Sequence, residues 1–277
     1  MKKIVALPLL TTLLVACGGD DMDVLRSSRS VATGELQATI IADVHRHAAT
    51  DTSAETYSTE LFVQLNAIDH DEGYPYTVEL AEGDSLSATV DGATVPLPAS
   101  YFPSEGDRLV VAYIEDFDQV AGGTELTVTL ARDSDGTSSS TPVLLLDETP
   151  FAIAGEPASV TLDDDLVVDW TPITDYQYHL RFVFSCERSD GSPTRFAVDY
   201  PNFFNQDDLV SPFTLDISEH VGMPGADTQL DNCKITTVLQ SCLETNPEAD
   251  PLAAIQVQST RRQYLETPLL LETVETP

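Results

Sequence analysis

Ser85 is the residue whose surroundings most suggest covalent chemistry, because it follows a Gly-Asp pair in the stretch Gly83-Asp84-Ser85-Leu86-Ser87. A serine hydroxyl becomes a nucleophile only when a general base lies within hydrogen-bond reach and nearby donors stabilise the oxyanion. Two Asp…His pairs farther along the chain could supply a base, Asp175 with His179 and Asp216 with His220. The elements around Ser85 decide whether such groups could meet.

The stretch 83–87 resembles the nucleophile block of the GDSL family of serine esterases and lipases. The resemblance implies an α/β fold in which Ser85 ends a buried parallel strand and begins a helix. It also implies Asp-x-x-His and Gly-x-Asn-Asp blocks, and neither is present. The residues after Ser85 instead alternate apolar and polar up to an Asp91-Gly92 turn signal, which predicts a strand. A GDSL-like serine hydrolase is therefore the remote alternative, and we expect no catalytic residues.

Some histidines and aspartates have a spacing that could hold a metal ion. His45 and His47 stand two residues apart, so on a strand both would point to the same exposed face, where His70 could join them. Near the predicted domain boundary, carboxylate oxygens suited to Ca²⁺ come from three consecutive residues: Asp163, Asp164 and Asp165. We expect no cofactor, and Ca²⁺ is the ion whose binding the sequence leaves open.

The cysteines predict one disulfide. If Cys17 is lipidated, three thiols remain, which allows one bridge and one free cysteine. Cys186 ends a predicted strand and Cys233 begins another, so they would meet if these strands were antiparallel neighbours. We therefore expect Cys186–Cys233, with Cys186–Cys242 as the alternative.

The first residues have the proportions of a secretory signal peptide. Lys2 and Lys3 precede an apolar segment shorter than the about 20 residues that cross a bilayer. It ends in Leu14-Val15-Ala16-Cys17, which resembles the lipobox of bacterial lipoproteins. The resemblance implies removal of residues 1–16, a diacylglycerol on Cys17, and a further acyl chain such as palmitate on the new amino terminus. In that family an Asp directly after the cysteine retains the protein at the inner membrane, so the resemblance implies that Gly18 directs this chain to the outer membrane of a Gram-negative cell, on its periplasmic or surface face.

The chain is strongly acidic, with a formal net charge of −33 at pH 7. This charge argues against nucleic acid as a partner, since phosphates need a basic surface. Dense carboxylates keep a protein dispersed in salt water, and clustered ones also suit divalent cations. Arg261-Arg262 is a rare pair of cations, expected to form ion pairs with surrounding carboxylates.

Apolar residues from position 36 onward recur with a period of two, which is typical of half-buried strands. The turns between them are rich in Gly, Asp, Pro and Ser, and no window of ten residues has a helical stripe. We therefore predict an all-β fold of two tandem antiparallel, immunoglobulin-like β-sandwiches. The expected divisions are a signal peptide at 1–16, a flexible tether at 17–33, and sandwiches at 34–150 and 151–277.

The second half contains a further resemblance. Leu166–Pro172, followed by Tyr178–Phe182, is similar to the second and third strands of fibronectin type III and related immunoglobulin-like domains. The resemblance implies that Trp170 packs into the core and that a short polar loop leads to the next strand.

Together these observations predict a lipid-anchored envelope lipoprotein with a non-catalytic binding or structural role. Its expected contacts are the membrane, through the anchor, and an envelope protein or glycan. A calcium-dependent adhesion or assembly module is the alternative.

Overall fold

The computed structural model describes residues 25–47, 56–68, 75–104, 108–118, 120, 122–188, 191–201, 209–221 and 230–271. The predicted signal peptide, Cys17 and His70 lie outside this part of the chain, as does the side chain of His47. Within the described residues the fold is all-β, as predicted. The helical turns there are Ser28–Ser30, Thr33–Glu35 and α1 (Ile217–Val221).

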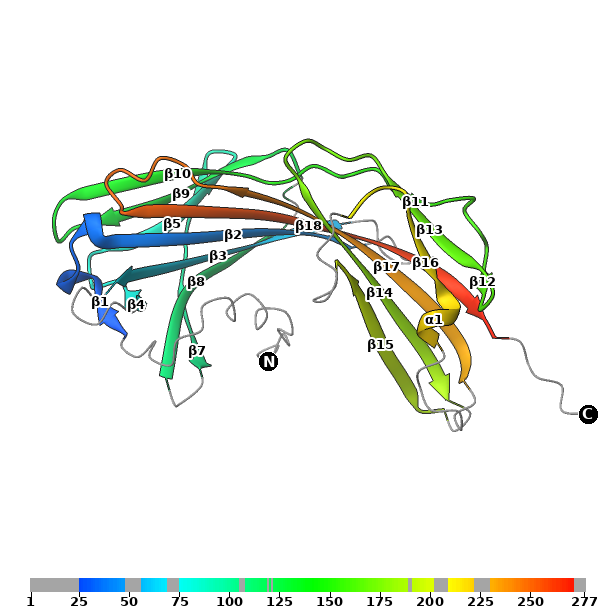
Figure 1. Cartoon of the computed structure of the whole chain (residues 1–277). Coiled ribbons are helices and arrows are strands. Elements are labelled where there is room, and N and C mark those ends of the chain that lie inside the picture. Colours follow the sequence, from blue (N-terminus) through cyan, green and yellow to red (C-terminus); the bar gives the residue numbers. More distant parts are fainter. Residues whose placement is uncertain are drawn as a thin grey trace, which may run out of the picture.

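The strands of the described residues form three sheets (Figure 1). The largest contains β1 (Arg26–Ser27), β2 (Leu36–His47), β3 (Thr56–Ile68), β4 (Pro75–Glu79), β7 (Ala99–Ser104), β8 (Arg108–Asp118), β12 (Val160–Thr161), β14 (Gln177–Arg188), β15 (Pro193–Tyr200), β17 (Leu230–Thr245) and β18 (Ala254–Leu270). The second contains β5 (Ser85–Val90), β6 (Ala93–Pro96), β9 (Glu125–Arg132) and β10 (Thr137–Leu144). The third contains β11 (Phe151–Ile153), β13 (Asp165–Trp170) and β16 (Phe213–Asp216).

The largest sheet runs through both halves of the molecule because β18 belongs to both. One edge of β18 pairs antiparallel with β17, from Val257 to Leu269. Its other edge pairs parallel with β2, from Ala254 to Arg262. Figure 1 shows β18, in orange to red, crossing the middle of the molecule. We call this continuous layer the shared sheet.

The first core lies between the shared sheet and the second sheet. The alternation of β2 and β3 turns their apolar residues inward, while β5 and β9 supply the facing layer. Its fully or almost fully buried members include Leu36, Ile40, Leu61, Leu65, Leu86, Ala88, Leu126 and Val128. An internal void between the layers measures about 10 Å³, close to the smallest space that holds one water.

The second core lies between the third sheet and the part of the shared sheet formed by β14, β15, β17 and β18. It contains a dense aromatic group, with Phe182 and Phe184 fully buried. Trp170 is also buried, as predicted, and its ring lies 5.8 Å from that of Tyr178 on the next strand.

The strand order of the second half confirms the predicted sandwich. Without the two-residue β12, the second half has seven strands in the described residues. The first, second and fifth of them along the chain form one sheet, in the order β11-β13-β16. The other four form the order β15-β14-β17-β18. Seven strands divided between two packed sheets are typical of immunoglobulin-like sandwiches. The predicted second and third strands correspond to β13 and β14.

Two details of the predicted architecture are wrong. The sheets are not purely antiparallel, since β2–β18, β1–β4 and β12–β18 are parallel pairs. The two sandwiches are also not successive units, because Leu252, Ile255 and Val257 belong to the first core although they follow the second in sequence. The physical reason is the length of β18, whose 17 residues exceed what one small sandwich covers.

No helix among the described residues is long and apolar enough to cross a membrane.

Candidate functional site

Ser85 lies at the start of β5, after a tight turn. The Asp84 N–H donates to the Ala81 carbonyl at 3.0 Å, and Gly83 has a φ of +97°, which favours glycine. Ser85 is exposed and pairs with Ala131 on β9. The residue therefore begins a strand, as predicted from the alternation after it, and not a helix.

Asp84, the neighbour of Ser85, is part of a buried structural network. Its side chain is 1% exposed and that of Arg132 is 2% exposed, with Arg132 Nε 3.5 Å from Asp84 Oδ2. The Ser28 hydroxyl donates to the same oxygen at 2.6 Å. Burial raises the pKa of Asp84, but hydrogen bonds from Ser28 and Ser134 and the charge of Arg132 outweigh it, so the pKa lies below its usual value.

Arg132 connects this turn to the first described residues of the chain. Its Nη2 donates to the carbonyls of Ser28 and Val31, and its Nη1 donates to the Thr33 hydroxyl at 2.7 Å. Residues 25–33, which their polar composition assigned to the flexible tether, are therefore held against the first core. The predicted tether at 17–33 is therefore wrong for residues 25–33, and residues 17–24 lie outside the described residues.

Asp216 and His220, considered as partners of a catalytic serine, make local contacts in the second half of the molecule. Asp216 Oδ1 accepts the N–H groups of Ser218 and Glu219 and so caps α1. The His220 imidazole Nε2 lies 2.8 Å from the Tyr200 hydroxyl. In the described part of the chain, no hydrogen bond joins Ser85 to a histidine. Ser85 lies over the first core, while both Asp…His pairs belong to the second half.

The residues predicted as metal ligands make separate local contacts. His45 is on the outer face of β2, as its parity predicted, and its Nε2 lies 3.5 Å from Asp43 Oδ2. Asp163, Asp164 and Asp165 are exposed, and Asp164 Oδ2 accepts from the Thr161 backbone N–H at 2.7 Å. This hydrogen bond and a second one from the Thr161 hydroxyl lower the pKa of Asp164.

Among the residues that the structure describes, no group of three or more His, Cys, Asp and Glu is arranged to hold a metal ion. Calcium binding at the three aspartates stays a prediction. Thermal unfolding in millimolar calcium, against sodium at equal ionic strength, would test it.

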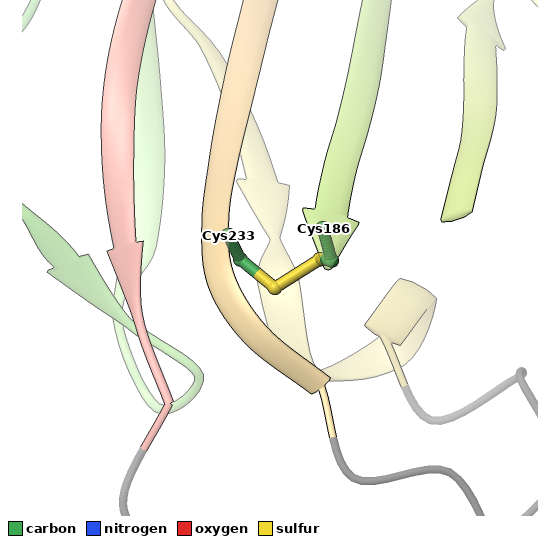
Figure 2. Close-up of a disulfide and its surroundings, with 2 residues drawn as sticks. All are labelled: Cys186 and Cys233. Atoms are coloured by element: carbon green, nitrogen blue, oxygen red, sulfur yellow. A yellow bond between two sulfur atoms is a disulfide. The ribbon is translucent and has the colours of Figure 1, made fainter. Parts of the chain in front are cut away.

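The predicted disulfide is present between Cys186 and Cys233 (Figure 2). β14 and β17 are antiparallel neighbours, and the register shifts between Ser185 and Glu187, which places Cys186 beside Cys233. Their Cα atoms are 4.1 Å apart. Cys242 is a buried free thiol at the other end of the paired region, and burial raises its pKa.

The connection between the halves is fixed onto β18 by buried polar contacts. Arg261 is 2% exposed, and its Nη1 donates to the Leu146 carbonyl at 2.9 Å while Nη2 contacts Glu148 at 2.8 Å. Thr149 is fully buried, and its N–H donates to the side chain of Gln263 at 3.1 Å. Gly122 packs closely against this segment, where a larger residue would not fit, because a Cβ there would collide with Leu146 and Arg261. The predicted ion pairing of Arg261 is confirmed.

Arg262 points to the opposite face of the shared sheet and pairs with Asp43 at 2.8 Å. Asp43 on β2 lies opposite Glu60 on β3. Glu60 in turn lies opposite Asp116 on β8. Burial, then the charges of Asp116 and Asp43, raise the pKa of Glu60, and Arg262 opposes the shift. Arg262 thus offsets a row of carboxylates on three neighbouring strands.

An aromatic group lies where β15 approaches β16, at the open side of the second sandwich. The rings of Tyr200 and Phe213 are 4.6 Å apart, and those of Phe182 and Phe213 are 6.0 Å apart. Tyr200 and Phe213 are only partly buried. This side of the molecule therefore presents both a strand edge and accessible aromatic surface.

The buried contacts of Arg132 and the contact of Gln263 with Thr149 are not predicted from the sequence. A signal for Arg132 existed, since it occupies an inward position in the alternation of β9 after Leu126, Val128 and Leu130. An arginine there must find polar partners inside the protein.

No protein-family model matches the chain, and no curated protein does. Among solved structures it is similar to the full ectodomain (Ig1–Ig3) of mouse nectin-like molecule 4, with 12% sequence identity and a TM-score of 0.23. The match covers 86% of this chain and 66% of the ectodomain, just under two thirds of its length. At this distance the similarity assigns neither a family nor a function.

Proposed function

We propose that this protein is a lipid-anchored lipoprotein of the bacterial cell envelope that acts as a non-catalytic scaffold. It would hold a binding surface at a set distance and orientation from the membrane. The observation that carries the scaffold role is the shared sheet, in which β18 completes both sandwiches.

A continuous sheet resists bending between the halves more than a linker does. Val257 to Arg262 of β18 are paired on both edges, with β17 and with β2. The buried contacts of Arg261 and Gln263 fix the connecting segment over the same place. Relative domain motion is the usual expectation for tandem domains with small interfaces, and here an unbroken strand replaces such an interface.

The anchoring part of the proposal rests on the lipobox resemblance at Cys17. Eight residue steps separate Cys17 from Leu25, so the described chain would begin at most about 28 Å from the lipidated residue. Two or more acyl chains would hold the protein stably at the membrane. Figure 1 shows β1 near one end of the molecule and the end of β18 near the other, so the second half would project away from the anchor.

The proposed partners are an envelope protein or a glycan. The net charge of −33 opposes binding to nucleic acid or to anionic lipid surfaces. The partly exposed aromatic rings of Tyr200 and Phe213 supply the amphipathic contact area typical of recognition surfaces.

Intact mass and membrane fractionation of the wild type beside Cys17→Ser test the anchoring proposal. The wild type should lack residues 1–16, carry acyl mass and float with outer membranes, while the variant should do none of these. Soluble, unmodified protein in both cases would overturn the anchored role.

The scaffold role is tested separately by binding envelope proteins and a glycan array to wild type and to Phe213→Ala. A ligand whose affinity falls in the variant supports a binding surface in the second half. Ester hydrolysis that is lost in Ser85→Ala would contradict a non-catalytic role.

A further inference from the structure

β15 is an edge of the shared sheet in the described part of the chain, since it pairs there with β14 alone. That pairing is regular from Tyr200 back to Pro193. Natural proteins protect such edges with charged side chains, an internal proline, a bulge or a covering loop. Among the described residues the pairing of β15 is regular, its proline stands at the first position, and its two charges have opposite signs, so its edge remains a template for a strand with complementary charges.

The outward side chains of β15 carry one positive and one negative charge, at equal distances from Ala197. Arg195, Ala197 and Asp199 are exposed on the outer face. Asp199 lies 3.5 Å from Arg181 on the neighbouring strand, and both side chains keep about half of their surface exposed, at 59% and 44%. Within the described residues no ion pair is formed by Arg195. In a chain with 13 basic and 46 acidic residues, it is unusual for an exposed arginine to have no carboxylate partner in the described part of the chain.

A twofold axis through Ala197 would pair this strand with itself in a complementary register. Two antiparallel copies centred there place Arg195 opposite Asp199 of the second copy, and symmetry repeats the contact. On the inner face, Phe196 would lie opposite Val198 of the second copy. Both residues are half-buried and pack against the second core, so the apolar row would continue across the axis.

We propose that two copies of this protein associate by antiparallel pairing of β15, centred on Ala197, so that the shared sheet continues from one copy into the next. A second copy fits better than an unrelated strand because the charge order of β15 is its own complement. Backbone hydrogen bonds supply the attraction and the two Arg195–Asp199 pairs fix the register. Since each copy is strongly acidic, association strengthens as salt screens the repulsion.

Cysteine cross-linking tests the register directly in purified protein under mild oxidation. Ala197→Cys places two thiols opposite each other at the axis, where cross-strand Cα atoms lie about 4.5–5.5 Å apart, within disulfide range. Pro193→Cys is the matched control, since Pro193 is exposed on the same face, takes no part in the charge pairs, and its two copies would stand about 26 Å apart along the strand. We expect a reducible dimer from Ala197→Cys and little from Pro193→Cys. Equal cross-linking of both variants, or none in Ala197→Cys, overturns the proposal.

Charge reversal tests the same pairing without a covalent bond. Arg195→Asp and Asp199→Arg should each raise the dimer dissociation constant by about tenfold or more, seen as a shift toward monomer in sedimentation velocity, because each places like charges opposite each other. An equimolar mixture of the two variants should recover the wild-type level, because the aspartate introduced into one copy then faces the arginine introduced into the other. A structural effect of either substitution would persist in the mixture, so failure to recover rejects the register.

Discussion

Arg132 shows how one buried side chain can organise a surface that resembles a catalytic site. It forms an ion pair with Asp84, next to the Gly83 turn, and donates hydrogen bonds to the carbonyls of Ser28 and Val31. The Gly-Asp-Ser stretch is thereby explained by anchoring of the amino-terminal segment. The acidic residue of the stretch has a structural partner, and Ser85 is left at the surface.

Replacing Arg132 with Met should lower the free energy of unfolding by about 3–5 kcal/mol, because Asp84 would remain buried without its cation. Urea denaturation followed by far-ultraviolet circular dichroism measures this loss. Arg29→Ala is the matched control, since Arg29 is exposed and donates to the Glu82 carbonyl. Arg29→Ala should change stability by less than about 0.5 kcal/mol. Similar losses in both variants would show that the buried network has no special role.

At the scale of elements, the disulfide ties β14 to β17 near the end of their pairing. It closes a loop with a sequence separation of 47 residues. Loop closure of this length lowers the entropy of the unfolded chain, which corresponds to about 4 kcal/mol of stability in the simplest account. The bridge also leaves Cys242 as the free thiol of the described residues.

Reduction of the wild type should therefore lower the urea midpoint, and Cys186→Ala/Cys233→Ala should show the same low midpoint with or without reductant. Cys242→Ala should keep the full response to reductant, since Cys242 is not bridged. Loss of the response in Cys242→Ala would mean that Cys242 takes part in the bridge.

At the scale of the whole molecule, β18 joins the two cores through one continuous sheet. Trp170 is the single tryptophan of the chain and lies in the second core. Its fluorescence therefore reports on that core alone. Changes made in the first core should still move the transition that Trp170 reports, if the shared sheet couples the halves.

Leu126→Ala removes a fully buried side chain of the first core and should cost about 2–5 kcal/mol. The fluorescence midpoint of Trp170 in urea should fall together with the circular dichroism midpoint. Ser138→Ala, at an exposed position of the neighbouring β10, should leave both midpoints in place. A Trp170 transition that stays at its wild-type midpoint in Leu126→Ala would show that the halves unfold independently.

The sequence was informative where side-chain alternation alone decides structure. The apolar sides of β2, β5 and β9 were predicted, because a period of two shows which residues face a core. The Cys186–Cys233 bridge was predicted because it required only that two neighbouring strands be antiparallel. The pairing partners of the strands could not be predicted in this way, since alternation does not show which strand lies next to which. Ile255 and Val257 therefore looked like the end of the second sandwich, although they lie in the first core.

The place of β18 after all the other described strands also has a consequence for biogenesis. Neither core is complete until residues 254–270 have joined both β2 and β17. Synthesis delivers this strand after the other described strands, so until it arrives β2 and β17 each lack one partner strand. Final closure must wait for this segment to arrive. A nonsense mutation that removes it would leave two unfinished sandwiches rather than one complete half.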